Sequence, residues 1–476
     1  MSDKTPPAAA ATKRINTSLS IRGGRLYIDE CDASDLAEQF GTPLFVVSAN
    51  HVLANLSRIQ QAFTQRWSCG PVRILCAFKA APLLALRRLL SEAGSGCDVF
   101  GHGELEGAIR GGVQPELISV NGSIKDRAMI RRAIEIGARI VLDSPREAQL
   151  CEEEAISLGR RARVMVRVKP FLTDLELNSD FLPSMEIREL TQVIKYGIPT
   201  SELLPLADRI SQSDNIELIG VHAHMGRHSK FPDVWRAWTY HCVELIAQIE
   251  RQFSGWAPQI IDLGGGFPSE SDRDTDVAVQ GYSGASLEEF ASVITTTLES
   301  ALREFGFNPE GITLELEPGR SLHTDTAIHL TTVKNCKAEQ LHRPRRWAEI
   351  DTSEVFLGIG GLNDAPPFDF MIANKADHPD DGVRDLVGMT CNAELLFNQV
   401  ATPPLVSGDV VALLNTGAYI EPMAANFNSL PRPGTVLVQG ADAEWAKRPE
   451  RVEEVFARDV MPSFVANRKN GAAHSD

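Results

Sequence analysis

Short apolar segments alternate with amphipathic helical segments along residues 44–320. Stretches such as HVLANLSRIQQAF and LEEFASVITTTLESALREFG have the apolar spacing of helices that lie on a core. Strands are predicted between them at residues 44–47, 74–78, 118–120, 140–143, 164–168, 218–222, 260–263 and 313–316. This alternation favours a parallel sheet, and roughly eight repeats favour a closed α/β fold, the TIM-like (β/α)8 barrel.

The pattern changes past residue 320. Runs such as DVVALLNTGAY and GTVLVQG are strand-like and are broken by Gly and Pro, which predicts a second, all-β domain of Greek-key or sandwich type over residues 321–466. Residues 1–15 are rich in Ala, Pro and Thr and are expected to be disordered, as is the tail over residues 467–476.

Composition argues against several classes of function. A formal net charge of -16 opposes unspecific binding to nucleic acid or to an anionic membrane. No apolar run approaches the roughly 20 residues that span a bilayer, and MSDKTPPAAAATKR lacks the apolar core of a secretory signal. The 8 cysteines form no C-x-x-C pair and no cluster with histidine, so reduced thiols and no metal site are expected. The protein is therefore expected to be cytoplasmic.

Lys79 directly follows the predicted strand 74–78. Lysine is rarely buried without a partner, so this residue could simply mark the point where the strand reaches the surface. The alternative is a partly desolvated amine at the mouth of the barrel, available as the nucleophile for a Schiff base. The neighbouring motifs decide between the two.

Three further predicted strands end in residues that could bind a ligand. GVHAHMGRH places His224 after one strand, and LELEPGRS places Glu317 and Arg320 after another. IIDLGGGFP supplies Gly264, Gly265 and Gly266. The C-terminal ends of barrel strands form the face where TIM-barrel enzymes build their active sites. Each motif also has an ordinary explanation: a packed core histidine, a surface ion pair, and a tight turn.

Together the motifs describe one ligand. An aldehyde would condense with Lys79, a phosphate would bind the bare backbone N–H groups of the glycines, a flat ring would lie on His224, and a basic ring nitrogen would meet Glu317. Pyridoxal 5'-phosphate has all of these features. The sequence therefore predicts that this cofactor binds at the barrel mouth.

The order of the motifs resembles the fold type III pyridoxal-phosphate decarboxylases, which include diaminopimelate, ornithine and arginine decarboxylases. The resemblance runs over residues 41–458 and rests on AFKA, GSGCDVFGHGEL, VNGSIK, HAHMG, DLGGGFP, EPGRS, TCNAE and GAYIEPMAANFN. It implies a TIM-like barrel over residues 44–320 and a β-domain over 321–466 that residues 16–43 join. It also implies a homodimer with shared active sites.

The resemblance implies roles for individual residues. Lys79 would form the Schiff base, His224 would stack on the cofactor ring, and Cys391 would protonate the substrate carbon in the partner's site. The residues that would contact the cofactor are Lys79, Asp98, Glu104, Arg167, His224, Gly264, Gly265, Gly266, Glu317, Gly319, Arg320 and Tyr419. For Cys391 the ordinary alternative is a buried cysteine that acts as a small apolar side chain.

Glu317 distinguishes decarboxylation from racemisation. A carboxylate keeps the pyridine nitrogen protonated, so that the ring accepts the electrons left when carbon dioxide departs. Alanine racemases on a similar barrel place an arginine at this position. The sequence therefore predicts an amino-acid decarboxylase. Two alternatives stay open: a pyridoxal-phosphate-dependent racemase or epimerase, and a catalytically silent regulatory homologue, which would be expected to lack the lysine or the cysteine.

The substrate is not fixed by fold and cofactor. Diaminopimelate decarboxylases usually carry an arginine-proline element after the strand that here reads AEIDTSEVFLGIGGLNDAPPFDF, and an acidic residue where this chain has Asn392. This difference argues against housekeeping lysine biosynthesis. The residues expected at the far end of the substrate are Asp351, Ser353, Glu354, Asn392 and Glu394. Their acidic balance favours a distal amine or another polar group. Arg227 and segment 171–190 also depart from the family, and the sequence assigns them no role.

Overall fold

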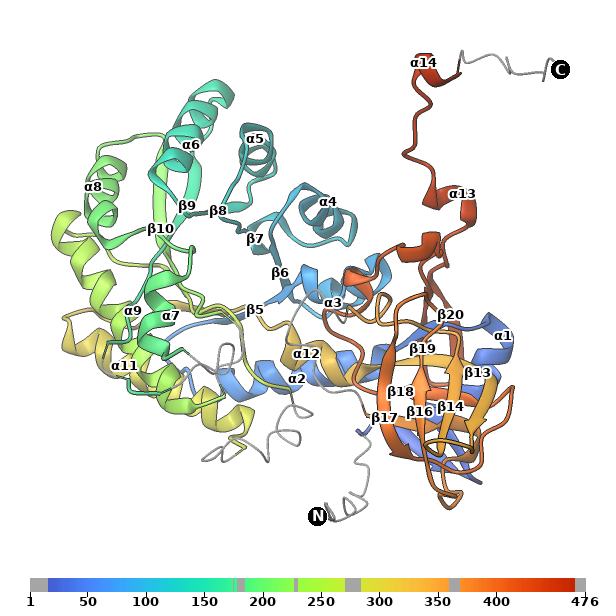
Figure 1. Ribbon diagram of the computed structural model, residues 1–476. Coiled ribbons are helices and arrows are strands. Elements are labelled where there is room, and N and C mark those ends of the chain that lie inside the picture. The colour runs from blue at the N-terminus through green and yellow to red at the C-terminus, as the bar shows by residue number, and fades with distance from the viewer. Residues whose placement is uncertain are drawn as a thin grey trace.

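Eight parallel strands close into a barrel in the computed structural model, which describes residues 16–173, 175–177, 185–226, 230–269, 284–358 and 369–466. The barrel strands are β5 (Val72–Ala77), β6 (Gly96–Val99), β7 (Ile118–Val120), β8 (Arg139–Leu142), β9 (Ala162–Arg167), β10 (Ile216–His222), β11 (Ile260–Asp262) and β12 (Thr313–Leu316). Pairing of β12 with β5 closes the ring. The predicted TIM-like barrel is confirmed (Figure 1).

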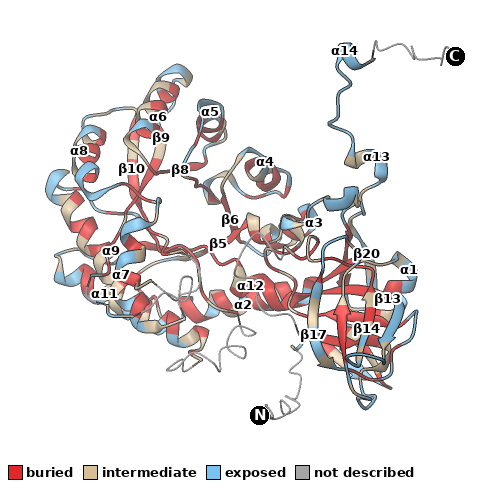
Figure 2. Cartoon of the chain, in the orientation of Figure 1, coloured by how far each residue is buried: buried red, intermediate tan, exposed pale blue. Residues whose placement is uncertain are grey.

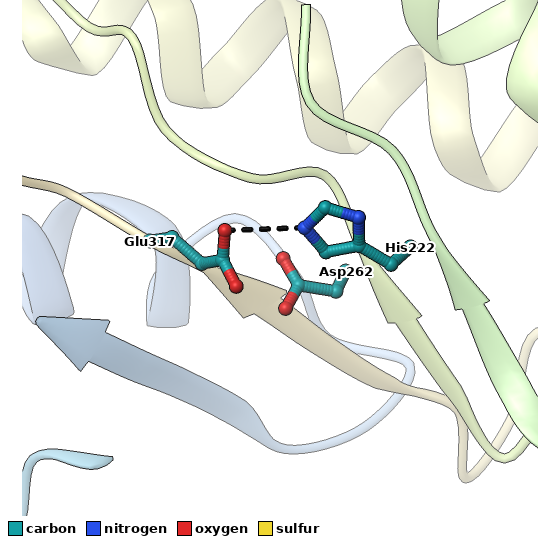
Figure 3. A group of neighbouring side chains, drawn as sticks. All are labelled: His222, Asp262 and Glu317. Atoms are coloured by element: carbon teal, nitrogen blue, oxygen red, sulfur yellow. Dashed lines mark hydrogen bonds and ion pairs between the residues drawn. The ribbon is translucent and has the colours of Figure 1, made fainter. Parts of the chain in front are cut away.

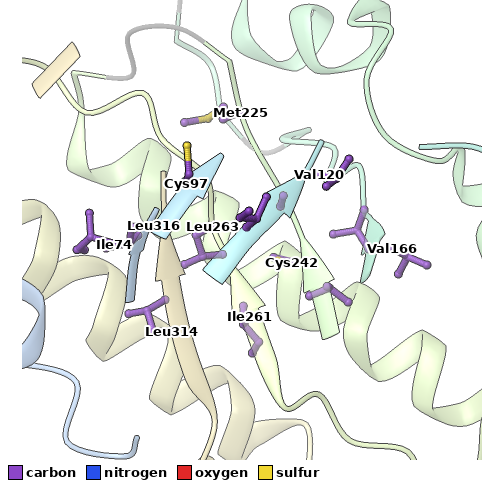
Figure 4. Packing of buried hydrophobic residues seen from close by; sticks show 14 of the residues in the cluster. Ile74, Cys97, Val120, Val166, Met225, Cys242, Ile261, Leu263, Leu314 and Leu316 are labelled. Carbon is purple, nitrogen blue, oxygen red and sulfur yellow. The ribbon is translucent and has the colours of Figure 1, made fainter. Parts of the chain in front are cut away.

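Helices between the strands cover the outside of the barrel. They are α2 (Ala49–Thr64), α3 (Leu84–Glu92), α4 (His102–Arg110), η2 (Pro115–Leu117), α5 (Arg127–Ile136), α6 (Pro145–Leu158), α7 (Ile187–Val193), α8 (Thr200–Ser211), α9 (Pro232–Gln252) and α11 (Leu287–Glu304), whereas the single turn η1 (Phe78–Ala80) lies at the barrel mouth directly after β5. α11 shows why such segments fold: a capping box of Ser286 and Glu289 starts it, and Phe290, Ile294 and Leu298 lie on its buried face. Figure 4 shows strand residues of this core, among them Leu314 and Leu316.

Two strand assignments differ from the prediction. Residues 44–47 are part of β4 (Leu44–Ser48), which pairs with strands of the second domain, so they are not the first barrel strand. β4 is buried along its whole length, which gives it the uniformly apolar pattern of a barrel strand. The barrel strand that the sequence did not predict is β6, because the glycines around it interrupt the apolar pattern. Gly96 is needed there because a Cβ would lie 2.5 Å from the backbone carbonyl oxygen of Leu117.

A separate mixed sheet of nine strands forms the second domain. Its strands are β4, β13 (Ala327–Glu339), β14 (Arg345–Ile350), β15 (Phe370–Ile372), β16 (Val383–Val387), β17 (Leu395–Ala401), β18 (Val410–Leu413), β19 (Gly434–Gln439) and β20 (Asp442–Lys447). β13 is antiparallel to β4, β14 and β18, whereas β4 and β19 are parallel. Short helices connect these strands: α12 (Arg320–His323), η3 (Thr324–Thr326), η4 (Ala373–Lys375), η5 (Glu421–Met423) and η6 (Phe427–Ser429).

The N-terminal strands form their own small sheet against this domain. β1 (Leu19–Arg22), β2 (Arg25–Ile28) and β3 (Cys31–Asp32) precede α1 (Ala33–Phe40). Leu26 and Ile28 share one buried apolar cluster with Leu44, Ile328 and Val436. At the other end of the chain, α13 (Val452–Val455) and α14 (Ser463–Ala466) project from the body and are largely exposed (Figure 2).

The two domains meet beside the C-terminal ends of the barrel strands. The backbone N–H of Tyr419, after β18, donates to the carbonyl of Ala80, after β5, at 2.8 Å. Among the described helices, none combines the length and the apolar character needed to cross a bilayer. The predicted disordered segments 1–15 and 467–476 lie outside the described residues.

Candidate active site

Lys79 lies at the mouth of the barrel, in the single turn η1 that follows β5. Its Nζ is ion-paired with Asp98 of the neighbouring strand β6, which pairs with Ala77 at the end of β5. The Lys79 side chain is 34% exposed and that of Asp98 is 1% exposed. Burial lowers the pKa of the Lys79 amine, but the nearby carboxylates of Asp98 and Glu317 raise it well above its usual value. Without a ligand the amine is therefore a cation.

Asn121 connects Asp98 to Glu317. Its Nδ2 donates to Asp98 Oδ1 and to Glu317 Oε1, both at 2.7 Å. Asn121 directly follows β7 and is buried. Burial and the charge of Glu317 raise the pKa of Asp98. The Asn121 amide thus lies between two carboxyl groups that would otherwise repel each other, and it donates to both. Asn121 was not predicted as a site residue, although a polar residue directly after an apolar strand was the available signal.

Glu317 lies among two further titratable side chains from adjacent strands. His222 Nε2 is 3.2 Å from Glu317 Oε2, and Asp262 completes a group whose ligand atoms all lie within 4.8 Å of one another (Figure 3). Burial raises the pKa of Glu317, but the His222 imidazole outweighs this and lowers it below its usual value. Burial and the charge of Glu317 raise the pKa of Asp262 well above its usual value. Atoms this close could also hold a metal ion, so the expected absence of a metal stays a prediction.

His224 presents a neutral ring beside these groups. Its Nδ1 accepts a hydrogen bond from the backbone N–H of Gly226 at 2.9 Å. Burial and the charge of Arg167 lower the pKa of His224 to about 3. An uncharged, flat imidazole is the chemistry that stacking on an aromatic cofactor requires.

The glycines after β11 bring the backbone close to its neighbours. Gly264 and Gly266 have φ values of +73° and +108°, which favour glycine. A Cβ at Gly265 would lie 2.1 Å from the carbonyl oxygen of Glu317, and one at Gly266 would lie 2.7 Å from that of Gly226. No side chain fits at these positions, so this turn offers only backbone to a ligand.

Arg320 and Tyr419 bring the two domains together beside Gly319. The Arg320 guanidinium carbon lies 5.4 Å from the centre of the Tyr419 ring. Arg320 Nη1 is buried and has no hydrogen-bond partner among the described residues. An orphaned guanidinium N–H beside a phenol and a glycine turn is a donor set that suits a phosphate. The residues present thus fit pyridoxal 5'-phosphate.

Glu104 and Arg167 occupy other positions around the barrel mouth. Glu104 Oε2 accepts from the backbone N–H of Phe100 at 2.7 Å, and burial raises the pKa of its carboxyl group. Arg167 is buried at the end of β9, 3.9 Å from Asp143 Oδ1 and 4.6 Å from the centre of the Tyr196 ring. Burial lowers the pKa of Arg167. The positive charge of Arg167 helps to keep the nearby imidazole neutral.

Cys391 lies in the second domain of the chain, apart from the residues at the barrel mouth. It is exposed in the turn between β16 and β17, where its backbone N–H donates to Asn428 Oδ1 at 3.2 Å. Within the single chain Cys391 is therefore not buried, as the ordinary alternative of an apolar core cysteine would require. Its contribution to a partner's site stays a prediction.

Four of the residues predicted at the far end of the substrate form two contacts beside Cys391. Asn392 Nδ2 donates to Glu354 Oε1 at 3.0 Å on the surface. Ser353 Oγ donates to the buried carboxylate of Glu394 at 2.5 Å. The Asn392–Glu354 pair is therefore accessible, whereas Glu394 is buried inside the domain, where Ser353 engages Oε1 and Oε2 has no hydrogen-bond partner among the described residues.

Asp351 is separated from this group. Both of its carboxylate oxygens are engaged within the β-domain, by Thr331 and Thr42 at 2.7 Å each and by Lys334 at 2.8 Å. Arg227 and residues 178–184 of segment 171–190 lie outside the described residues. The same is true of residues 359–368, where an arginine-proline element would be expected.

Comparison with known proteins identifies the family. Residues 50–324 match the model of the pyridoxal-dependent decarboxylase, pyridoxal binding domain. Diaminopimelate decarboxylases of Methanothermobacter thermautotrophicus and Bacillus subtilis are each 28% identical to this chain, over 94% and 93% of it and over 98% and 97% of their own lengths. A crystal structure of diaminopimelate decarboxylase from M. jannaschii matches with a TM-score of 0.83 at 25% identity, covering 94% of this chain and 99% of that one. The predicted cofactor and reaction class are confirmed. The chain belongs to the fold type III pyridoxal-phosphate-dependent decarboxylases and is a carboxy-lyase.

Proposed function

We propose that the enzyme removes the α-carboxylate of an amino acid that carries an amine or another polar group at its far end. The observation that carries this proposal is the accessible Asn392–Glu354 pair, which adjoins Cys391. A carboxylate with an amide beside it accepts hydrogen bonds from an ammonium group. A purely apolar substrate would add no hydrogen bond or charge interaction to this pair.

When bound, the cofactor supplies the electron sink that lets carbon dioxide leave. We assign Lys79 to the cofactor aldehyde, His224 to the face of the ring and Glu317 to the ring nitrogen. Arg320, Tyr419 and the glycine turns would hold the phosphate. The low pKa of Glu317 supports this assignment, because an anion there favours a protonated ring nitrogen and hence decarboxylation over racemisation.

Cys391 is assigned as the acid that delivers a proton to the substrate α-carbon. A thiol has an ordinary pKa of about 8.5, so it is mostly protonated at neutral pH and can donate. Its exposed turn leaves it free to enter the site of a second copy of the chain. The enzyme would then be a homodimer whose two sites each take residues from both chains.

The matched relatives are named diaminopimelate decarboxylase, and this chain differs from that pattern at Asn392. The segment AEIDTSEVFLGIGGLNDAPPFDF also contains no arginine to bind a distal carboxylate through two hydrogen bonds, which favours a substrate other than that of lysine biosynthesis.

The test is carbon dioxide release from a panel of meso-diaminopimelate, L-lysine, L-ornithine, L-arginine and L-leucine, together with the D-isomers of the last four amino acids. The proposal expects one of the substrates with a basic or polar far end other than meso-diaminopimelate to have the highest kcat/KM. A clear preference for meso-diaminopimelate would overturn the proposed substrate class. Interconversion of L- and D-isomers without carbon dioxide would point to a racemase.

A further inference from the structure

Three adjacent barrel strands each place one titratable side chain at the same level. His222 ends β10, Asp262 ends β11 directly opposite it, and Glu317 follows β12. Relative exposures are 1% for His222, 0% for Asp262 and 3% for Glu317. Two carboxyl groups this close in a buried site resist ionising together, so one of them keeps its proton. The hydrogen-bond partners of Glu317 and Asp262 decide which of the two carboxyl groups keeps the proton.

Glu317 is held at both carboxylate oxygens. Asn121 Nδ2 donates to Oε1 at 2.7 Å and His222 Nε2 lies 3.2 Å from Oε2. Because a carboxylate only accepts hydrogen bonds, the His222 nitrogen that faces it carries the hydrogen. The plane of the Glu317 carboxylate is therefore fixed by two donors from two other strands.

Asp262 has no comparable support among the described residues. Its Oδ1 accepts from the backbone N–H of Gly264 at 2.8 Å, and its Oδ2 is buried without a partner. The other buried acids of the barrel interior do have cations: Asp98 pairs with Lys79, and Glu315 with Arg139 at 2.6 Å. An unpaired buried carboxyl group is most stable as the neutral acid.

We infer that His222 is a positioning residue that assigns the negative charge of this pair to Glu317 and leaves the proton on Asp262. The inference rests on the proposed function, in which Glu317 faces the ring nitrogen of the cofactor. His222 itself touches neither cofactor nor substrate in this scheme. It acts through the carboxylate that it holds.

The experiment measures how strongly the apoenzyme prefers pyridoxal 5'-phosphate over 1-deazapyridoxal 5'-phosphate, in which carbon replaces the ring nitrogen. The Kd of 1-deazapyridoxal 5'-phosphate divided by the Kd of pyridoxal 5'-phosphate reports the contact with that nitrogen alone. His222→Phe should lower this ratio by about tenfold, the scale of one hydrogen bond to a charged group. His222→Gln, which keeps a donor, should restore most of it. A loss of affinity for both ligands alike, with the ratio unchanged, would overturn the inference.

Asp262→Asn tests the location of the proton. Because Asp262 is inferred to be neutral already, this variant should keep the wild-type ratio. In the His222→Phe background, where the charge can move to Asp262, Asp262→Asn should raise the ratio again. If Asp262→Asn alone lowers the ratio as much as His222→Phe does, Asp262 is the anion and the inference is wrong.

Two controls separate the possible failures. His329→Phe removes an equally buried histidine, which contacts Thr352 at 2.7 Å in the β-domain, and should leave the ratio unchanged. Glu317→Gln should lower the ratio. If Glu317→Gln has no effect, the assigned contact with the ring nitrogen fails, and the proposed function with it. If Glu317→Gln lowers the ratio but His222→Phe does not, only the role of His222 is refuted.

Discussion

Gly319 lies so close to Tyr419 that a Cβ at position 319 would be 2.4 Å from the tyrosine hydroxyl. The contact joins the barrel to the β-domain at the proposed phosphate site. Gly319→Ala should push the Tyr419 ring away and weaken binding of pyridoxal 5'-phosphate by about tenfold, the loss of roughly one charge-assisted hydrogen bond. Equilibrium dialysis of the apoenzyme measures this. Gly103→Ala is the matched control, because a Cβ there meets nothing within 4 Å. Equal affinities for the two variants would contradict the assignment.

Lys79 should be the residue that carries the cofactor covalently. Borohydride treatment followed by peptide mass spectrometry should find the cofactor on Lys79, and Lys79→Ala should lose both the label and the yellow colour. Lys125 is a suitable control because it too follows a barrel strand, β7, but it is fully buried, with its Nζ 2.9 Å from Glu147. A label on Lys125 in the wild-type enzyme would refute the assignment.

Glu317→Gln should retain the cofactor and lose the reaction. The phosphate contacts do not involve Glu317, so cofactor content should stay near wild type, while kcat falls by several orders of magnitude because the ring nitrogen loses its anion. Absorbance of the bound cofactor and carbon dioxide release under saturating substrate test the two halves separately. Wild-type kcat in this variant would show that Glu317 does not face the ring.

Mixing two inactive variants should restore activity if the sites are shared between chains. Lys79→Ala disables the barrel contribution and Cys391→Ala disables the β-domain contribution, so a heterodimer has one site that carries neither change. Activity of the mixture after subunit exchange should approach a quarter of the wild-type value, given random pairing into dimers. No recovery, together with an active monomer by light scattering, would refute a shared site.

The acid sensitivity of the β-domain should depend on Glu450. Arg432 and Asn426 bond to its carboxylate and hold the pKa of Glu450 at about 2. A pKa lowered in the folded state contributes stability above the usual carboxyl range and loses it as pH falls from about 4.5 towards 2. Glu450→Gln should therefore lower stability by about 1–2 kcal/mol at pH 7, allowing for partial exposure, and by much less near pH 2.

Urea midpoints at both pH values measure this effect. Glu444→Gln, on the neighbouring strand β20, controls for a general loss of charge. A Glu450→Gln deficit that stays constant from pH 7 to pH 2 would contradict the ionic origin of the effect.

The sequence predicted the barrel and the cofactor because the strand-end motifs are local, whereas the roles assigned to individual residues stay predictions. Glycine turns, a lysine after a strand and the EPGRS segment can each be recognised within ten residues or fewer. Asn121, His222 and Asp262 were missed as site residues for the opposite reason. His222 and Asn121 are separated from Glu317 by 95 and 196 positions, so no spacing in the sequence signals their contacts.

The strand assignments failed where burial hid the pattern. β4 is apolar on both faces because it lies in the middle of a covered sheet, which no single-strand pattern distinguishes from a barrel strand. β6 is short and starts with a glycine that close packing requires. Both errors come from tertiary contacts rather than from local propensity.

The position of β4 has a consequence for synthesis on the ribosome. Leu44 pairs with Leu330 of β13 on one side and with Gly434 of β19 on the other. An early strand must therefore wait for partners from residue 327 and from residue 434 onward, whereas each barrel strand from β6 to β12 pairs with the strand made just before it, and only β5 waits for β12 to close the ring. The last barrel strand ends at Leu316 and β19 begins at Gly434, so all eight barrel strands are made before the sheet that holds β4 can be completed.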